Sequence, residues 1–236
     1  MMCELSVVIL CGGLGTRLRS EIGNEIPKIL APIGNKYFLE YLINWVNNLL
    51  GEINYEVILC LGYGQNKILN VIKKLDIKVQ VSAEETQLGT FPAVLDAAKV
   101  AKSKRLLIIN GDTLFKMNIK ELIGNFDSKS YLCIKKNNSI KKQKNGYEID
   151  LFTKKLKYSE NFPEYISVGA FLINKSIINT FKKDRSNIPQ LLDKELISKI
   201  EPYPIYLKSN CDFIDIGTKE NYKLAQKFLP EFYPLN

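Results

Sequence analysis

Short apolar runs alternate with amphipathic stretches along most of the chain. The runs at 7–11, 55–61 and 105–109 contain mainly Val, Ile and Leu and are bounded by Gly, Asn or charged residues. Runs that stay apolar without alternation are typical of strands covered on both faces. We therefore expect buried strands there. Further strands are expected at 77–81, 131–135, 147–152, 165–174 and 202–207.

Helical periodicity separates these runs. In 36–50, the residues Phe38, Leu42, Trp45 and Leu49 recur at the spacing of one helix face. Further helices are expected at 65–75, 92–101, 118–127, 187–200 and 218–228, the last with Thr218 as its N-cap. The polar stretch 135–145 is expected to be a hairpin or mobile loop. Strands that alternate with helices predict βαβ units, so the expected fold class is α/β with a largely parallel sheet.

The length and the amino-acid composition of the chain narrow the classes of protein to which it can belong. A chain of 236 residues is long enough for one domain with a full α/β core. No apolar stretch has the length of a membrane span, and the N-terminus lacks the pattern of a signal peptide. The five cysteines are scattered and the chain has no histidine, so we expect reduced thiols, a cytoplasmic protein and no zinc site.

The formal net charge of +8 comes from an excess of lysine. Many of these lysines fall between Lys135 and Lys157, without interleaved aromatic residues. A platform for single-stranded nucleic acid needs those aromatic residues for base stacking. We interpret the lysines as a solvated surface that favours anionic substrates, and we expect neither a nucleic-acid nor a membrane partner.

A glycine loop follows the first expected strand. Gly12, Gly13 and Gly15 carry no side chain, so backbone N–H groups there can approach a phosphate closely. Arg17 follows the loop, and Lys28 follows the rigid Pro27. A P-loop would need Gly-Lys-Ser/Thr, and a dinucleotide fingerprint would need a third glycine where Leu18 stands. A polyphosphate site of another type is favoured over a simple glycine turn.

The motif Gly-Gly-Leu-Gly-Thr-Arg-Leu, followed by Pro27-Lys28, resembles the signature of sugar-1-phosphate nucleotidyltransferases. Asn110-Gly111-Asp112 and Asp215-Ile216-Gly217-Thr218 resemble two later motifs of that family, in the family's order. The resemblance extends from 7 to about 228. It implies a Rossmann-like three-layer sandwich with a mixed, mostly parallel central sheet. It also implies one nucleotidyltransferase domain over 1–236, without the C-terminal β-helix domain of larger relatives.

The resemblance assigns roles to individual residues. Catalytic roles fall to Arg17, Lys28 and Asp112, and Mg²⁺ would be held by Asp112 and Asp215. Nucleotide binding falls to Leu10, Gly12, Gly13, Gly15, Thr16, Glu84, Gly89, Thr90, Asn110 and Gly111. Sugar binding falls to Glu160 and Gly169. Plainer roles stay open for three of these: Glu84 in an exposed acidic loop, Glu160 on the surface, and Gly169 as a packing glycine.

Four departures from the family pattern bear on substrate choice. Gln87 replaces a proline, and Phe91-Pro92 replaces a small pair with glycine, at the start of the expected helix 92–101. Asn161 occupies the place of a lysine that holds the sugar phosphate in relatives, and Lys157 or Lys208 are candidates to replace that lysine. Ser167-Val168 replaces residues with an amide side chain near the sugar, which indicates a changed sugar preference.

The implied reaction is attack by a sugar 1-phosphate on the α-phosphorus of a nucleoside triphosphate, with release of pyrophosphate. A carboxylate at Glu84 matches the adjacent N1–H and N2–H donors of guanine, so GTP is the expected nucleotide. The opening motif is most similar to that of D-glycero-α-D-manno-heptose 1-phosphate guanylyltransferases, which implies a heptose 1-phosphate as the other substrate and a role in surface polysaccharide biosynthesis. Relatives are often oligomers, so a homo-oligomer is a further expectation.

Two other functions stay open on the sequence. Transfer to phosphocholine or another non-sugar phosphate would need an aromatic cage, for which Tyr158, Phe162 and Tyr165 are candidates. A nucleotide-sugar sensor without turnover would keep the fold and lose the catalytic charges, whereas Arg17, Lys28, Asp112 and Asp215 are all present.

Overall fold

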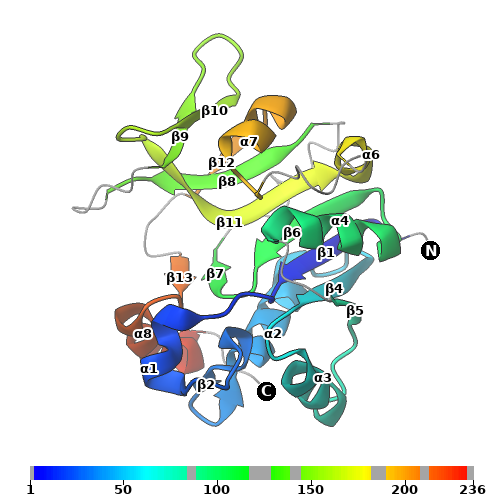
Figure 1. Ribbon diagram of the computed structural model, residues 1–236, viewed down its shortest axis with the longest axis vertical. Coiled ribbons are helices and arrows are strands. Elements are labelled where there is room, and N and C mark those ends of the chain that lie inside the picture. Colours follow the sequence, from blue (N-terminus) through cyan, green and yellow to red (C-terminus); the bar gives the residue numbers. More distant parts are fainter. Residues whose placement is uncertain are drawn as a thin grey trace.

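The computed structural model describes residues 3–83, 89–116, 129–138, 145–181, 190–207 and 213–232. Within that part of the chain, one nine-stranded sheet forms the centre of the molecule (Figure 1). Its main path runs β10-β9-β11-β6-β1-β4-β5, and β8 joins β11 and β12 beside it. The strands are β1 (Leu5–Leu10), β4 (Tyr55–Leu61), β5 (Gln80–Ala83), β6 (Arg105–Asn110), β8 (Tyr131–Lys136), β9 (Gly146–Ile149), β10 (Leu156–Ser159), β11 (Tyr165–Asn174) and β12 (Tyr203–Tyr206).

The sheet is mixed, with a parallel part around the first strand. β1 is parallel to both β4 and β6, and β4 is parallel to β5. β11 is antiparallel to β6, β8 and β9, so the sheet changes direction at β11. This confirms the expected α/β class and the mostly parallel character near the glycine loop.

Side chains of each central strand enter two hydrophobic cores, one on each face. Val7 and Ile9 belong to one core, whereas Val8 belongs to the other. The first core is closed by helices α2 (Phe38–Leu50), α3 (Gln65–Lys74) and α8 (Lys219–Phe232). The second is closed by α4 (Thr90–Val100), α6 (Lys175–Thr180) and α7 (Lys194–Ile200), and Figure 1 shows α4 across β1 and β6. Three layers result, which explains why the central strands carry apolar side chains on both faces.

Small elements outside the main sheet were not predicted. β7 (Thr113–Phe115) pairs with β13 (Phe213–Asp215), and β2 (Pro32–Ile33) pairs with β3 (Lys36–Tyr37). Short turns of helix follow the glycine loop and Pro27: η1 (Thr16–Leu18), α1 (Arg19–Ile22) and η2 (Lys28–Leu30). These pieces are too short for periodicity to reveal, yet they carry three of the predicted catalytic or metal-binding residues.

Several element bounds differ from the prediction. β5 begins at Gln80 rather than at 77, and β9 ends at Ile149 rather than at 152. Asp150 ends β9 because its carboxylate accepts hydrogen bonds from the backbone N–H groups of Phe152 and Thr153, which form the turn into β10. The hairpin therefore lies at 146–159. Residues 139–144 of the predicted loop and the predicted helix 118–127 lie outside the described residues.

The helix termini agree more closely with the sequence. α4 begins at Thr90, so Pro92 lies in its first turn, where a missing N–H costs little. Thr218 caps α8, since its Oγ1 accepts from the N–H of Asn221 at 3.3 Å. In contrast, α7 begins at Lys194 rather than at 187 because Asp193 is its N-cap and accepts from the N–H of Leu196.

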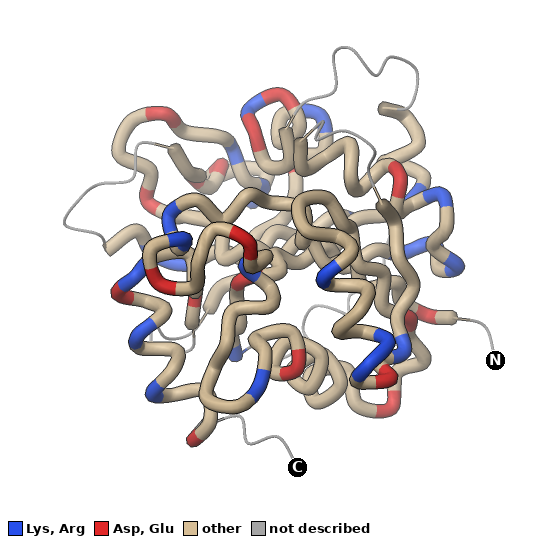
Figure 2. The backbone as a smooth tube through the Cα atoms, turned by 60° about the horizontal axis from the view of Figure 1, so that its bottom comes forward, with Lys and Arg blue, Asp and Glu red and all other residues tan. Residues whose placement is uncertain are grey.

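Cysteines and charges match the compositional interpretation. Cys11, Cys60 and Cys133 are buried free thiols, and burial raises the pKa of Cys133 to about 12. Figure 2 shows Lys and Arg distributed over many elements, with Asp and Glu among them, rather than gathered on one face. Among the described helices, none has the length and apolar character that crossing a membrane requires.

Candidate active site

Three parallel strands end together beside the glycine loop. Leu10 of β1 pairs with Asn110 of β6 on one side and with Cys60 of β4 on the other. The chain continues from there into the glycine loop and into Gly111-Asp112. The carboxyl ends of parallel strands are where α/β sheets bind ligands. The sheet therefore places both predicted motifs at the same edge.

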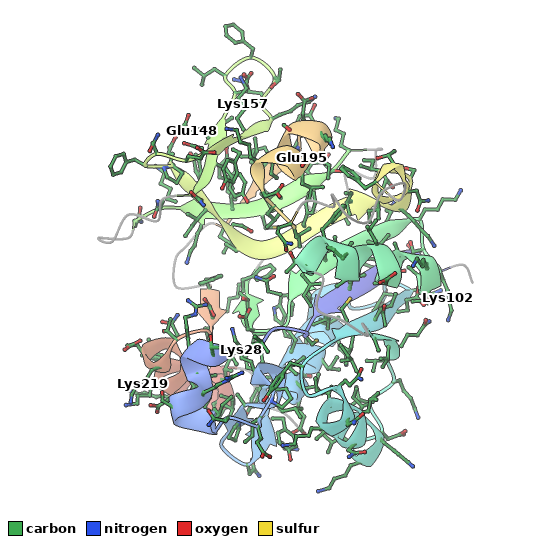
Figure 3. All side chains as sticks on the ribbon, in the orientation of Figure 1. Lys28, Lys102, Glu148, Lys157, Glu195 and Lys219 are labelled. Carbon is green, nitrogen blue, oxygen red and sulfur yellow. The ribbon has the colours of Figure 1, made fainter. Side chains whose placement is uncertain are left out.

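Lys28 reaches this edge through a rigid segment. Ile29 and Leu30 of η2 are almost fully buried, which anchors the turn that carries Lys28. Gly15 lies against it, and a Cβ on Gly15 would be 3.3 Å from the Cβ of Lys28. The Nζ of Lys28 donates to Oδ2 of Asp112 at 2.5 Å. In Figure 3, Lys28 lies beside the α1 turn, below β7 and β13.

Asp215 joins the same cluster from the other end of the chain. β13 is antiparallel to β7, and Asp215 pairs with Thr113, the neighbour of Asp112. The N–H of Ile216 donates to the backbone oxygen of Asp112 at 3.0 Å. Two aspartates that are distant in sequence are thus adjacent in the fold.

The groups that shift the pKa of Asp215 show that Arg17, Lys28, Asp112 and Asp215 lie close together. Burial is the largest cause that raises the pKa of Asp215, and the nearby Asp112 raises it further. The N–H of Gly217 and the cations Lys28 and Arg17 lower it in part. Two carboxylates beside two cations form a site in which added positive charge relieves repulsion between the carboxylates.

A cleft of about 540 Å³ opens beside this cluster. It is lined by Leu10, Cys11, Gly12, Gly13, Leu14, Lys28, Ile29, Cys60, Gly89, Thr90, Ala93, Asn110, Gly111, Asp112 and Gln190. Most of the predicted nucleotide-binding residues are in this lining. The lining does not include Gly15, Thr16 or Arg17. Arg17 lies next to Gly217 instead, since its Nη2 is 3.2 Å from the position that a Cβ on Gly217 would take. Arg17 therefore lies on the Asp215 side of the cluster.

The donor set fits a hard divalent cation. Mg²⁺ is usually bound by one or two carboxylates together with water and substrate phosphates. Asp112 and Asp215 supply two carboxylates, and the glycine loop beside them leaves room for phosphate. Among the described residues, no group of three or more His, Cys, Asp and Glu side chains forms a metal site. The residues thus fit a metal that arrives with a polyphosphate better than a metal caged by protein alone.

The predicted sugar residues have different surroundings. Gly169 interrupts the register of β11 against β8 and has a φ of +82°, which favours glycine. A Cβ there would lie 2.5 Å from Nδ2 of Asn110, so Gly169 adjoins a residue of the cleft lining. Glu160, by contrast, is exposed, and its carboxylate accepts from Lys194 at 3.2 Å. The structure does not bring Glu160 to the lining, and its sugar-binding role stays a prediction.

Three further predicted binding residues are Glu84, Lys157 and Lys208. Glu84 and Lys208 lie outside the described residues. Lys157, proposed as a replacement for the missing lysine at Asn161, forms an ion pair with Asp150 at the β9–β10 hairpin. Figure 3 shows Lys157 near the top of the molecule and Lys28 below its centre. Lys157 therefore belongs to the hairpin, and the structure does not place it beside Lys28 as a replacement for the missing lysine.

Gln190 is a lining residue that sequence reasoning missed. Its Oε1 accepts from the N–H of Thr90 at 3.1 Å and lies 3.4 Å from Thr90 Oγ1. A Cβ on Gly89 would come within 2.3 Å of the Gln190 amide, so glycine at 89 leaves the space that Gln190 occupies. No motif surrounds Gln190 in the sequence, and only the fold brings it across to the start of α4.

The chain resembles known proteins over nearly its whole length. The profile of the nucleotidyl transferase family matches residues 6–231. D-glycero-alpha-D-manno-heptose 1-phosphate guanylyltransferase of Campylobacter jejuni subsp. jejuni serotype O:2 is 33% identical over 229 residues, which cover 92% of this chain and 97% of the relative. The protein of the same name from Aneurinibacillus thermoaerophilus is 32% identical over 239 residues, which cover 97% and 100%.

Solved structures agree with this resemblance. The crystal structure of HddC from Yersinia pseudotuberculosis superposes with a TM-score of 0.77 at 27% identity, covering 94% of this chain and 98% of that chain. A second structure of the same protein, in complex with GMP-PN, superposes with a TM-score of 0.76 and the same coverage. The similarity in sequence and in structure thus spans the same elements that build the cleft.

Proposed function

This chain belongs to the nucleotidyl transferase family, and from that premise we propose that it condenses a sugar 1-phosphate with a nucleoside triphosphate to give an NDP-sugar and pyrophosphate. The favoured pair is D-glycero-α-D-manno-heptose 1-phosphate with GTP. Two relatives at 32–33% identity carry the name of that heptose guanylyltransferase, and HddC has been solved with GMP-PN. These relatives support guanine as the base and a heptose as the sugar.

One observation carries the proposal: Arg17, Lys28, Asp112 and Asp215 meet beside the glycine loop. Three different contacts bring these residues together. Lys28 donates a hydrogen bond to Asp112, and β13 places Asp215 beside Thr113, the neighbour of Asp112. The charge of Arg17 lowers the pKa of Asp215. A site that combines two cations, two carboxylates and a glycine loop suits a polyphosphate with a divalent cation.

The chemistry needs no general base. A phosphate oxygen of the sugar 1-phosphate is already an anion, so it forms its bond to the α-phosphorus without losing a proton. The bond from that phosphorus to the β-phosphate oxygen breaks, and its electron pair leaves with pyrophosphate. The chain has no histidine, which agrees with such a reaction. The protein must then align two anions and stabilise the charge that develops between them.

Each charged side chain has a role in that alignment. Lys28 is held by Asp112, and we assign its remaining N–H donors to the α-phosphate and to the incoming sugar phosphate. Arg17, on the Asp215 side, is assigned to the departing β- and γ-phosphates. The glycine loop contributes backbone N–H groups, and Gly89, Thr90 and Gln190 line the far end of the cleft for the nucleoside.

Asp112 and Asp215 would hold the divalent cation, for which we propose Mg²⁺. When bound, it would neutralise phosphate oxygens and so reduce repulsion between the two substrates. The raised pKa of Asp215 indicates that its charged form lacks full compensation within the chain itself. A divalent cation held by Asp112 and Asp215 would supply that compensation.

The alternative functions have weaker support. Tyr158 pairs edge-on with Tyr147, and Tyr165 pairs edge-on with Tyr206. The first three rings belong to the second core or pack against it. None of the four lines the cleft beside Lys28, where a cage for choline would be needed. A non-catalytic sensor has no need of the complete set of four charges at the cleft. We also propose a cytoplasmic location and keep a homo-oligomer as a prediction.

The test is pyrophosphate release with each nucleoside triphosphate against a panel of phosphates. The panel contains D-glycero-α-D-manno-heptose 1-phosphate, α-D-mannose 1-phosphate, α-D-glucose 1-phosphate and phosphocholine. We expect the highest kcat/KM with GTP and the heptose phosphate. Faster release with phosphocholine would replace the sugar assignment, and tight NDP-sugar binding without any release would favour the sensor.

A further inference from the structure

Lys135 is a half-buried lysine that the mechanism has not used. It lies on β8, next to Ile134 of the second core and two residues after Cys133 of the first core. Because strand side chains alternate between faces, Lys135 shares the face of Cys133. Phe213 and Ile214 of β13 pack against that same first core. Lys135 therefore faces β13, the strand that carries Asp215.

The contacts of Lys135 place its ammonium close to the reacting centre. Its Nζ lies 3.6 Å from the centroid of the Phe213 ring. Phe213 and Asp215 are two residues apart on β13, so their side chains point to the same side of that strand. The charge of Asp215 also acts on Lys135 and raises the pKa of its ammonium, against the larger lowering by burial.

Lys135 is not neutralised by the described part of the chain. None of the ion pairs between described residues includes it. Burial has the largest effect on the pKa of Lys135 and lowers it below the usual lysine value. A desolvated cation beside a ring and near one buried carboxylate gains from an additional anion.

The position of Lys135 separates it from the cations assigned to the triphosphate. In Figure 1, β13 lies between β8 above and the α1 turn below, and η1 with Arg17 precedes α1 directly. Arg17 approaches Asp215 from the side of the glycine loop, whereas Lys135 approaches it from the sheet that contains β8 and β11. Cations thus approach Asp215 from two sides, an arrangement that suits a site for two phosphates.

We propose that Lys135 binds the phosphate of the sugar 1-phosphate and so supplies the charge that Asn161 does not. This inference rests on the proposed function, because it names the residue that holds the second substrate. Gly169 of the neighbouring β11 adjoins Asn110 at the cleft, so the β8–β11 side already reaches the site. The sugar phosphate lies between Lys135 and Lys28, with its phosphate near Asp215.

The test compares Lys135→Met with Lys135→Arg and with the control Lys136→Met. Lys136 is the exposed neighbour on the opposite face of β8. With GTP, Mg²⁺ and D-glycero-α-D-manno-heptose 1-phosphate, we expect Lys135→Met to raise the KM for the sugar phosphate about 10-fold or more. The KM for GTP changes less than about twofold, Lys135→Arg restores part of the loss, and Lys136→Met matches the wild type.

A second measurement separates this inference from the proposed function. Calorimetry follows binding of the heptose phosphate to each variant in the presence of a GTP analogue whose α–β bridging oxygen is replaced by carbon. Weaker binding to Lys135→Met alone supports the inference even if turnover prefers another nucleotide. Equal binding, an equal rise in both KM values, or a fall in Tm without a change in KM would overturn it.

Discussion

Lys28 and Asp112, 84 residues apart in the chain, form an ion pair in which Nζ lies 2.5 Å from Oδ2. Both side chains are largely buried, with exposed fractions of 19% and 23%. The pair joins the turn after Pro27 to the end of β6, next to a second carboxylate, Asp215. Lys28 is thus a counter-ion of both carboxylates, and the proposed mechanism assigns it to the α-phosphate.

Lys28→Ala is expected to lower kcat at least about 100-fold, because it removes a pre-positioned cation from the place where charge develops. The variant also leaves Asp112 and Asp215 without their lysine, so binding of the divalent cation should become no weaker. Pyrophosphate release measured at saturating GTP and sugar phosphate tests the first expectation, and titration with Mg²⁺ tests the second.

The matched control is Lys67→Ala. Lys67 also forms an ion pair, with Glu25 at 2.8 Å, but both partners are exposed and lie outside the cleft lining. Loss of an exposed pair costs less than about 1 kcal/mol, and we expect wild-type turnover. Near-normal turnover of Lys28→Ala would remove Lys28 from the mechanism.

Asp215→Asn is expected to weaken metal-dependent binding of GTP by about 10-fold or more, since it removes one of two anionic ligands. The fold should tolerate this change. Because burial and Asp112 raise the pKa of Asp215, its charged form is disfavoured in the folded protein, and a neutral amide avoids that cost. The Asn side-chain oxygen can still accept from the N–H of Gly217. The Tm should therefore stay the same or rise.

Calorimetry with Mg²⁺ and GTP, together with thermal denaturation, checks both parts of this prediction. Asp150→Asn is the control, because Asp150 belongs to the β9–β10 hairpin and pairs with Lys157, far from Lys28. Unchanged metal dependence in Asp215→Asn would mean that Asp112 holds the cation without it.

Strong periodicity made the central strands and most helices predictable. β4 and β11 match the predicted bounds. Their apolar runs are flanked by charged residues, glycine or asparagine, and a strand that is covered on both faces ends at such residues. β7, β10 and β13 were missed. Each is four residues or fewer, and each is defined by its pairing partner rather than by its own pattern.

The cluster of four charges beside the glycine loop was predictable for a different reason from the residues around it. Gly-rich and Asp-containing motifs are local in sequence, so Arg17, Lys28, Asp112 and Asp215 carried their own signal. Gln190 and Lys135 carry none, since a polar residue in a loop and a lysine at a strand end are common on any surface. Their positions depend on how the β8–β11 side meets the glycine loop, which is a property of tertiary structure.

Gly169→Ala is expected to reduce kcat/KM about 10-fold, because the new methyl group displaces the Asn110 side chain from the cleft. Its positive φ adds a backbone cost of about 1–2 kcal/mol. Gly34→Ala separates these effects. Gly34 also has a positive φ, of +60°, but a Cβ there meets no atom within 4 Å. Thermal denaturation should show a loss of stability in both variants, the larger one in Gly169→Ala because of its clash with Asn110, whereas only Gly169→Ala should lose activity. Equal activities would refute a role for the Gly169–Asn110 contact.

Gln190→Ala is expected to raise the KM for GTP about 3- to 10-fold, the effect of losing about one hydrogen bond at the nucleoside end of the cleft. The Gln190 amide fixes the start of α4 through Thr90, and both residues line the cleft with Gly89. The KM for the sugar phosphate should not change, because Gln190 bonds Thr90, whereas Lys28 and Asp112 bond each other. Initial-rate kinetics with each substrate varied in turn measure both values.

The control for this last variant is Gln226→Ala on α8, whose amide donates to the oxygen of Pro32 at 3.5 Å, outside the cleft lining. Gln190 is exposed, so its truncation should change the free energy of unfolding by less than about 0.5 kcal/mol. A fall in Tm together with equal rises in both KM values would show that Gln190 supports the fold rather than the nucleotide. A rise confined to GTP would instead place the nucleoside against Gly89, Thr90 and Gln190.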